Sequence, residues 1–464
     1  MIQKCLIIGS LVSVAVCSAL AFNALTGFSD RTTIAEELLP DRISFGDRHI
    51  ARAMYLLEHG TLGDEVEPFL GGFARGPVEP VVIATSFFLL GERLWSFWII
   101  QILFFVGAVL YLYGIGKRFL GDGWFGALPA FMLALFWGEN TQVFFLNNEV
   151  LASFFITGFA YYLLRYYETD RPYFLGLAGA LISFLVLAKP IFEYFLPVIV
   201  LLLVLRIWRR HGVPGAMWHG AVFAGALLLI VGGWHVRNHA VLGTYRISAG
   251  GHAILMRAES ALYPDKTIVG FTIASIAGDY IADKFVPGYA ALEEPRRMIR
   301  AVFNTRRPEM RRSGLTEFQT DEIFLSEATT IIKEHPVRYL ALTPAWLFRL
   351  NSPPHYRGSS IERMFVGSHD KLPDVLKILI NALIRIPWVV LMFLGIGEAL
   401  RRAWRGRQEI SFFVLIAVFM LYNNMVYSLL AHAEARYLFP SLPFYFLCLG
   451  LVFQRYFLKK PLSI

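Results

Sequence analysis

The sequence carries little charge for its length. Only 17% of its 464 residues are charged, 56% are hydrophobic, and the mean hydropathy is +0.53. This composition argues against an ordinary soluble globular protein, which would not contain so many long apolar runs. The runs are continuous rather than alternating, which also disfavours a transmembrane β-barrel. We therefore expect an all-α polytopic membrane protein with about 10–12 transmembrane helices.

Cysteine is scarce, and recognisable soluble-enzyme signatures are missing. Cys5, Cys17 and Cys448 all lie within apolar segments, so they cannot cross-link an exported loop by a disulfide or form a metal-binding cysteine pair. No Ser-His-Asp, Walker or Rossmann signature occurs, and Gly250-Gly251 lacks the dinucleotide-binding spacing. The chain also has no internal repeat and no low-complexity tract. Common hydrolase and nucleotide-binding functions are therefore disfavoured.

The formal net charge is +8, and much of the excess lies in short loops between apolar runs. In a membrane protein such loops stay in the cytoplasm, so the charge sets orientation and suggests anionic lipid or phosphate partners rather than nucleic acid. This placement puts both termini inside and predicts about ten spans. They are expected near residues 5–25, 94–114, 124–138, 149–165, 173–189, 190–206, 216–234, 375–397, 410–430 and 437–455.

Three regions follow from this topology. Residues 1–234 form an N-terminal transmembrane core whose first exported loop covers 29–93, 235–374 form a large exported region, and 375–464 form the last transmembrane helices. The apolar segments 78–90 and 337–350 are too short to span, so we expect interfacial or re-entrant helices. The first apolar run is expected to be an uncleaved signal anchor rather than a cleaved signal peptide.

In this topology acidic and basic residues meet at the exported ends of the spans, whereas the cytoplasmic ends hold almost only basic residues. A charged residue at the end of a membrane span is costly and therefore needs a functional or structural reason. The exported face, where acidic and basic residues meet, is thus the candidate active site. Its residues are Asp47, Arg75, Glu79, Glu149, Lys189, Glu193, Arg237, Glu434 and Arg436.

Simple structural interpretations compete with a function at these positions. Asp47 can cap the amphipathic helix expected at 50–60, and Asn148 can cap a helix that begins with Glu149. Lys189 can be a snorkelling lysine at a tight turn. Exported arginines such as Arg436 oppose the positive-inside trend, so anion binding is favoured there.

The candidate residues lie in motifs that follow a definite order. These are Asp47-Arg48 with the helix 51–60, Arg75-Gly76-Pro77, Asn148-Glu149, Leu187-Ala188-Lys189-Pro190, Trp234-His235-Val236-Arg237-Asn238 and Glu434-Ala435-Arg436-Tyr437. The ordered set resembles the integral-membrane GT-C glycosyltransferases, in particular bacterial relatives of protein O-mannosyltransferases and lipid A aminoarabinose transferases. The resemblance covers most of the chain, and the Trp-x-x-Arg-Asn and Glu-x-Arg-Tyr elements match best.

The resemblance implies an inverting sugar transfer from a polyprenyl-phosphate donor to a lipid, glycan or protein acceptor. It implies that Asp47 is the general base and that Glu149 is a second acid that orients the acceptor or a cation. The donor phosphate would be held by basic side chains. The substrate-binding residues it implies are Arg75, Lys189, Arg237, Asn238, Glu434, Arg436 and Tyr437. It also implies a bacterial inner membrane, with the site facing the periplasm or exterior.

Two departures from the family pattern bear on metal binding. Arg48 stands where relatives often have an acid, and Ala51 stands where they have a tyrosine. One carboxylate of a metal pair is thus missing, so Asp47 is expected to act as a lone base. A divalent cation remains open, and no other cofactor is expected.

Two other functions remain open. A membrane polysaccharide polymerase or ligase would also have exported arginines and a large loop, but chain length and the first-loop aspartate argue against it. A transporter or flippase for lipid-linked sugars predicts ionisable residues at midspan and paired repeats. The charges here crowd at span ends instead.

Overall fold

The computed structural model describes residues 2–26, 49–62, 76–289, 301–352, 374–405, 410–431 and 433–457. Over these ranges the regular secondary structure consists of helices, and no β-strand occurs among them. The predicted all-α class is confirmed.

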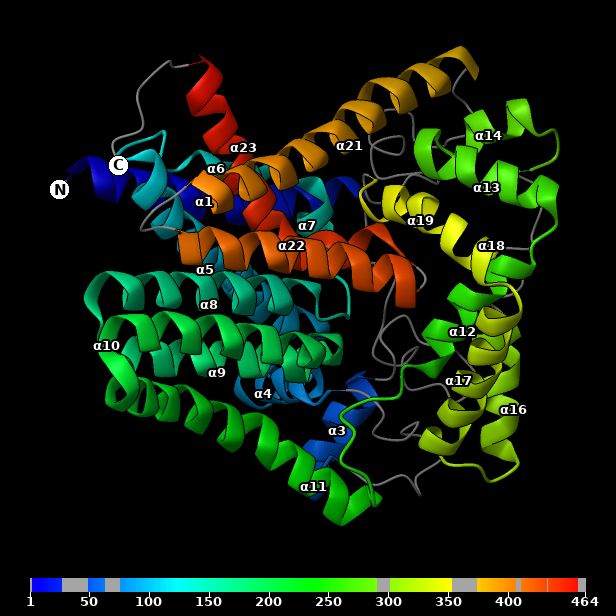
Figure 1. Ribbon diagram of the computed structural model, residues 1–464, viewed down its shortest axis with the longest axis horizontal. Helices are drawn as coiled ribbons and strands as arrows, with labels where there is room; N and C mark the ends of the chain where they lie inside the picture. The colour runs from blue at the N-terminus through cyan, green and yellow to red at the C-terminus, as the bar shows by residue number, and fades with distance from the viewer. Residues whose placement is uncertain are drawn as a thin grey trace.

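Long helices lie side by side and form a bundle that fills the left and centre of Figure 1. They are α1 (Ile2–Thr26), α5 (Leu94–Leu120), α8 (Glu149–Thr169), α9 (Pro172–Ala188), α10 (Leu196–Leu227), α21 (Asp374–Arg405), α22 (Ile410–Leu430) and α23 (Leu442–Phe457). Six stretches of the described residues are long and apolar enough to cross a membrane. These are Ile2–Ala24, Leu94–Leu120, Pro190–Leu242, Leu383–Trp404, Phe412–Leu430 and Ala435–Tyr456. The chain is an integral membrane protein.

The stretch Pro190–Leu242 contains two of the predicted spans. It begins with the 3-10 helix η2 (Pro190–Phe195) and continues through α10 into the π-helix η3 (Leu228–Gly232) and α11 (Gly233–Leu242). Gly212 has φ 66° and ψ −168°, so the backbone leaves the helical conformation there. Glycine tolerates this positive φ, and Figure 1 shows that α10 reverses direction within its length at the left of the bundle.

The span expected at 124–138 is wrong as one continuous helix. The chain forms α6 (Leu128–Leu135) and α7 (Trp137–Gln142), separated by Phe136 in an extended conformation. The Asn140 side chain donates hydrogen bonds to Ala134 O at 3.0 Å and Phe136 O at 3.2 Å. It therefore satisfies carbonyl groups that the break exposes, which irregular backbone inside a membrane requires.

Glycine and aromatic side chains interlock α5 with α8. In each contact an aromatic ring occupies the place where a Cβ of the facing glycine would lie, at 2.6–2.8 Å from the nearest ring atom. Such contacts allow close approach of helices in a membrane, where packing rather than water exclusion drives association. The pairs are Gly107 with Phe154, Gly114 with Tyr161, and Gly158 with Tyr111.

The bundle has two distinct ends. At one end of the bundle α1 begins, and α5, α8 and α23 reach their last residues. We call this the terminus-bearing end. The opposite end, where α8 begins and α9 ends, is the loop-bearing end. Helices from the segment 251–350 gather beside it at the right of Figure 1. They are α12 (Gly251–Glu259), η4 (Ser260–Leu262), α13 (Asp265–Ala277), α14 (Asp279–Phe285), η5 (Ala301–Arg306), α16 (Arg307–Arg312), α17 (Glu317–Glu334), α18 (Pro336–Ala341) and α19 (Thr343–Leu350).

Two shorter helices precede α5. The amphipathic helix predicted at 50–60 is α3 (His49–His59), and the apolar segment 78–90 is α4 (Val78–Leu90). They pack against each other through Ile50, Ala53, Ile83 and Phe87, which are all buried. The second short segment, 337–350, is divided between α18 and α19. Neither α4 nor α19 is as long as a span, as the sequence predicts.

Candidate active site

A buried ion pair stands at the loop-bearing end. Glu149 is the first residue of α8, and Lys189 caps the C-terminus of its neighbour α9. The Lys189 Nζ contacts Glu149 Oε2, and the two side chains are only 7% and 2% exposed. The acid lies at a helix N-terminus and the base at a helix C-terminus, so both helix dipoles favour the charges. Lys189 is therefore a buried, paired cation, and the snorkelling interpretation is wrong.

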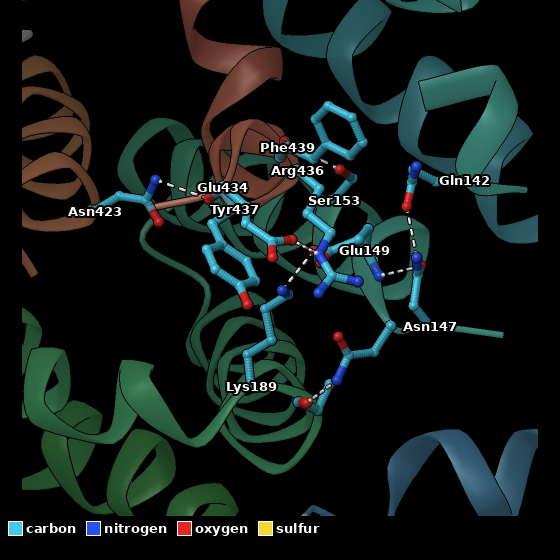
Figure 2. Close-up of polar contacts among 12 residues, drawn as sticks. Gln142, Asn147, Glu149, Ser153, Lys189, Asn423, Glu434, Arg436, Tyr437 and Phe439 are labelled. Atoms are coloured by element: carbon cyan, nitrogen blue, oxygen red, sulfur yellow. Dashed lines mark hydrogen bonds and ion pairs between the residues drawn. The ribbon is translucent and has the colours of Figure 1, made fainter. Parts of the chain in front are cut away.

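A second ion pair lies above the first and is more accessible. Glu434 and Arg436 belong to the segment that enters the 3-10 helix η7 (Ala435–Ser441), with Arg436 Nε 2.6 Å from Glu434 Oε2. Both side chains are 40% exposed. Ser153 Oγ donates to the Phe439 carbonyl at 3.1 Å and attaches η7 to α8. Figure 2 shows that the two carboxylates and the two cations converge on one region.

Tyr437 connects the two pairs. Its ring lies 5.4 Å from Lys189 Nζ and 5.3 Å from the Arg436 guanidinium carbon, within cation–π distance. It also stacks on Tyr427 of α22, with ring centroids 4.6 Å apart and an interplanar angle of 14°. Asn423 Nδ2 donates to the Tyr437 carbonyl at 3.1 Å. The last turns of α22 thus fix the ring that faces both cations.

Amide side chains shape the start of α8 in a way that differs from the prediction. Asn148 occupies the N-cap position, but its side chain forms no capping bond and donates instead to the Ala188 carbonyl. The neighbouring Asn147 accepts from the Glu149 backbone N–H at 3.2 Å. Asn147 Nδ2 also donates to Gln142 Oε1 at 2.5 Å. Asn148 therefore ties the start of α8 to the end of α9, next to Lys189.

Asp47 and Arg75, two of the residues predicted for the site, lie outside the described residues. The chain resumes at Gly76, which packs directly against the end of α9. A Cβ at position 76 would lie 1.5 Å from Leu187 O, so only glycine fits there. The backbone at residue 76 is thus brought to the turn that carries Lys189.

A third acid–base pair at this end was not recognised as a pair from the sequence. His49 Nε2 is 3.2 Å from Glu79 Oε2, and the side chains are 6% and 1% exposed. Burial, followed by the nearby Arg52, lowers the pKa of His49 well below its usual value. The predicted topology places Glu79 on this face. The signal for His49 was its position at the start of the amphipathic helix.

Arg237 and Asn238 lie on α11 and have a different setting. The Arg237 guanidinium lies 5.0 Å from the Trp234 ring and donates to Asn238 Oδ1 at 3.1 Å. Asn238 is buried and donates to the Arg246 carbonyl at 2.8 Å, which fixes the chain after α11. These contacts connect α11 with its own loop, whereas Lys189 and Arg436 meet through Tyr437. Their phosphate-binding role stays a prediction.

The expectation that the cytoplasmic ends hold almost only basic residues is wrong for the terminus-bearing end. Its basic side chains pair with acids that are close to them in the fold. Lys117 Nζ is 2.7 Å from Asp122 Oδ1, and Arg118 Nε is 2.8 Å from Glu168 Oε1. Further pairs are Arg210 with Asp170 and Arg401 with Glu398. The loop-bearing end differs in having pairs with both side chains nearly fully buried, Lys189–Glu149 and His49–Glu79, whereas at the terminus-bearing end the buried Glu398 meets arginines that are 23% and 11% exposed.

Within the described ranges, no group of three or more His, Cys, Asp or Glu side chains is arranged to hold a metal ion. Asp47 lies outside these ranges, so the divalent cation left open by the sequence stays an open prediction.

Comparisons with known proteins agree with this architecture. Residues 74–234 match the family model described as dolichyl-phosphate-mannose-protein mannosyltransferase. The matched segment includes Arg75, Glu149 and Lys189 and ends at Trp234. A search of curated proteins gave no match.

Solved structures give a match over almost the whole chain. The oligosaccharyltransferase of Archaeoglobus fulgidus in its apo form is 14% identical, with 97% of this chain and 51% of that chain covered and a TM-score of 0.50. The same enzyme tethered to an acceptor peptide containing the NVT sequon gives 14% identity, coverages of 97% and 50%, and a TM-score of 0.50. The chain thus spans about half the length of the archaeal enzyme. ArnT from Cupriavidus metallidurans bound to undecaprenyl phosphate is 15% identical, with coverages of 95% and 77% and a TM-score of 0.37.

The chain therefore has the fold of the archaeal oligosaccharyltransferase, and its segment 74–234 resembles a family of membrane glycosyltransferases. The family match covers part of the N-terminal membrane region, and the archaeal likeness extends over almost the whole chain and shows its fold. The resemblance inferred from the sequence is confirmed at this level.

Proposed function

We propose that this protein transfers a sugar from a polyprenyl-phosphate-linked donor to a lipid, glycan or protein acceptor at the loop-bearing end of the bundle. The observation that carries the proposal is the convergence of Lys189 and Arg436 on that end. Lys189 lies within the segment that matches dolichyl-phosphate-mannose-protein mannosyltransferases. We place this end on the periplasmic or exterior side of a bacterial inner membrane, because the basic loops lie at the opposite end.

Two cations suit the leaving group of this reaction. When the sugar–phosphate bond breaks, negative charge develops on the departing lipid phosphate, and fixed cations stabilise it. Arg436 is the accessible cation, and its planar guanidinium can bind a phosphate with two parallel hydrogen bonds. Lys189 lies deeper and adds a point charge. Arg75, Arg237, Asn238 and Tyr437 complete the proposed substrate-binding set.

The carboxylates keep these cations in place before the donor binds. Each cation has a carboxylate partner, Lys189 with Glu149 and Arg436 with Glu434. A donor phosphate would replace Glu434 as the partner of the accessible Arg436, whereas Glu149 would remain paired with Lys189. We therefore assign Glu149 to the orientation of Lys189 and, through it, of the substrates.

Asp47 is the proposed general base. It would accept the proton of the acceptor hydroxyl while the acceptor oxygen attacks the anomeric carbon. The bond from that carbon to the phosphate oxygen breaks, and the sugar configuration inverts. With Arg48 beside it in the sequence, Asp47 acts as a lone base.

Gene deletion and complementation test the proposal. Glycolipids, glycans and glycoproteins from deleted cells are compared by mass spectrometry with those from cells complemented by wild type or Asp47→Asn. We expect a sugar mass that wild type restores, and loss of a general base should reduce the modified fraction by about 100-fold or more. A fully active Asp47→Asn variant would contradict the base assignment.

Asp122→Asn is the matched control. It makes the same chemical change at the terminus-bearing end, where Asp122 is 79% exposed and pairs with Lys117. It should restore the modification to the wild-type level. If neither wild type nor this control restores any sugar mass, the glycosyltransferase assignment itself fails.

A further inference from the structure

We propose that Arg257 and Tyr339, which lie outside the candidate site, are positioning residues that cap the C-terminus of α22 and so fix Tyr437 between the two cations. The inference rests on the proposed function for its catalytic meaning. The geometry that carries it is independent of the sugar and the acceptor.

Arg257 is a buried cation held by neutral groups. It lies on α12 and is 0% exposed. Its guanidinium donates to Ser428 O at 2.9 Å, Tyr339 O at 2.8 Å and Ser260 Oγ at 3.0 Å. The guanidinium carbon also lies 4.1 Å from the Tyr339 ring centroid. Burial lowers the pKa of Arg257 to about 10, which leaves it charged at neutral pH. A buried charge of this kind is costly, so its position needs an explanation.

The explanation lies at the end of α22. The last carbonyl groups of a helix lack intrahelical partners, and the helix dipole makes that end negative. Ser428 and Leu429 are in the last turn of α22. Arg257 donates to the Ser428 carbonyl, and the Tyr339 hydroxyl donates to the Leu429 carbonyl. Two side chains from the loop region therefore cap a membrane helix with a cation and a hydroxyl.

The capped turn leads into the candidate site. Tyr427, one residue before Ser428, stacks on Tyr437, and Asn423 one turn earlier donates to the Tyr437 carbonyl. Tyr437 in turn faces Lys189 Nζ at 5.4 Å. A continuous series of contacts thus runs from the loop region through the end of α22 to the buried Lys189–Glu149 pair. We infer that release of the cap would let η7 shift and weaken the binding of a lipid phosphate.

Arg338 provides a matched control. It is the residue before Tyr339, and it also bonds a carbonyl, with Nη2 2.8 Å from Tyr263 O. Its other partner is Asp265 Oδ1 at 2.8 Å. These contacts join α18 to the start of α13, within the loop region. Arg338→Ala therefore removes an arginine that links loop helices but contacts no residue of α22 in the contacts described.

The experiment combines hydrogen exchange with lipid binding on the full-length protein in detergent. Exchange is followed by mass spectrometry in peptides covering 420–441 and 336–350, and binding of undecaprenyl phosphate is followed by tryptophan fluorescence. For Arg257→Ala we expect about tenfold faster exchange in 420–441 and about tenfold weaker binding. Tyr339→Phe, which removes only a hydroxyl, should give about threefold changes. Arg257→Lys should recover part of both losses, because an ammonium still donates to the Ser428 carbonyl.

Three outcomes separate the possibilities. Unchanged exchange in 420–441 for both Arg257→Ala and Tyr339→Phe would overturn the inference, and Tyr339→Phe decides alone if Arg257→Ala does not fold. Equal acceleration in 420–441 for Arg338→Ala would also overturn it, because the effect would then be general destabilisation. If wild type fails to bind undecaprenyl phosphate, the proposed function fails, while the exchange result still decides the capping role.

Discussion

The two ends of the bundle both carry ion pairs, and two of these pairs, one from each end, differ sharply in burial. At the loop-bearing end, Lys189 and Glu149 are 7% and 2% exposed, and the distance between their charged groups is that of direct contact. At the terminus-bearing end, Lys117 and Asp122 are 37% and 79% exposed. Exposed pairs contribute about 0–1 kcal/mol, whereas burial of two charges costs several kcal/mol before their attraction offsets it. Burial of both members therefore distinguishes the Lys189–Glu149 pair from the Lys117–Asp122 pair, although Glu398 at the terminus-bearing end is also buried, between Arg401 and Arg402.

The exposed pairs have an ordinary explanation. Basic residues at short loops orient the chain in the membrane, and acids such as Glu168 and Asp170 neutralise part of their charge. The buried pairs have no such role, because no orientation requires Glu149 or Glu79 to leave water. Their shared position supports the proposed substrate-binding site.

Breaking the Lys189–Glu149 pair should have the largest effect. Lys189→Met leaves the Glu149 carboxylate buried without its cation, so we expect a loss of about 3–5 kcal/mol of stability. Sugar transfer should be lost as well. Thermal unfolding in detergent measures the first effect, and mass spectrometry of the glycosylated products measures the second.

The double variant Lys189→Met/Glu149→Leu separates stability from function. It removes both buried charges, so much of the stability should return, since hydrophobic replacement of a buried pair is often neutral. Sugar transfer should stay lost because the cation proposed to bind the phosphate is absent. Recovery of transfer in the double variant would show that the pair has only a structural role.

The pH dependence of stability tests the cost of a buried charge within the loop region. Glu259 ends α12, and no hydrogen-bond partner of its Oε2 is found among the described residues. Burial raises its pKa from 4.5 to about 7, with Arg306 opposing and Glu327 adding to the shift. The folded state therefore binds more protons than the unfolded state in this window, so stability falls as pH rises from about 4.5 to 7.

Glu259→Gln should remove this pH dependence. The variant should unfold at a higher temperature than wild type at pH 8, and the difference should shrink at pH 5, where the wild-type carboxyl is protonated. Glu168→Gln at the terminus-bearing end is the control, because Glu168 pairs with Arg118 and Arg165. A Glu259→Gln advantage that is equal at the two pH values would contradict the assignment.

Much of the fold could be predicted from apolar run lengths. The runs at 94–114 and 410–430 correspond to α5 (Leu94–Leu120) and α22 (Ile410–Leu430), because a span needs a continuous apolar stretch that is visible in sequence. The break within 124–138 could not be predicted. It depends on Asn140, which bonds the freed carbonyls, and on Phe136, which stacks on Trp388 of a distant helix.

Four of the residues predicted for the candidate site do meet at one end, but their pairings could not be predicted. Topology and motif order brought Glu149, Lys189, Glu434 and Arg436 to one end. Which cation meets which acid depends on the packing of α8, α9 and η7, and sequence spacing does not encode it. The sequence around Arg257 does not indicate that this residue is buried, because its burial arises from contacts with α18, α19 and α22, which are distant in sequence.

The smallest effect is expected for the exposed Lys117–Asp122 pair. Lys117→Ala and Asp122→Ala each break the exposed pair at the terminus-bearing end, where solvent screens the charges and either partner is readily hydrated. Each variant should lose less than about 1 kcal/mol of stability and keep wild-type sugar transfer. Thermal unfolding at low and high salt gives the measurement, and the small loss should shrink further at high salt. If either variant loses as much stability as Lys189→Met, burial does not explain the difference between the two ends.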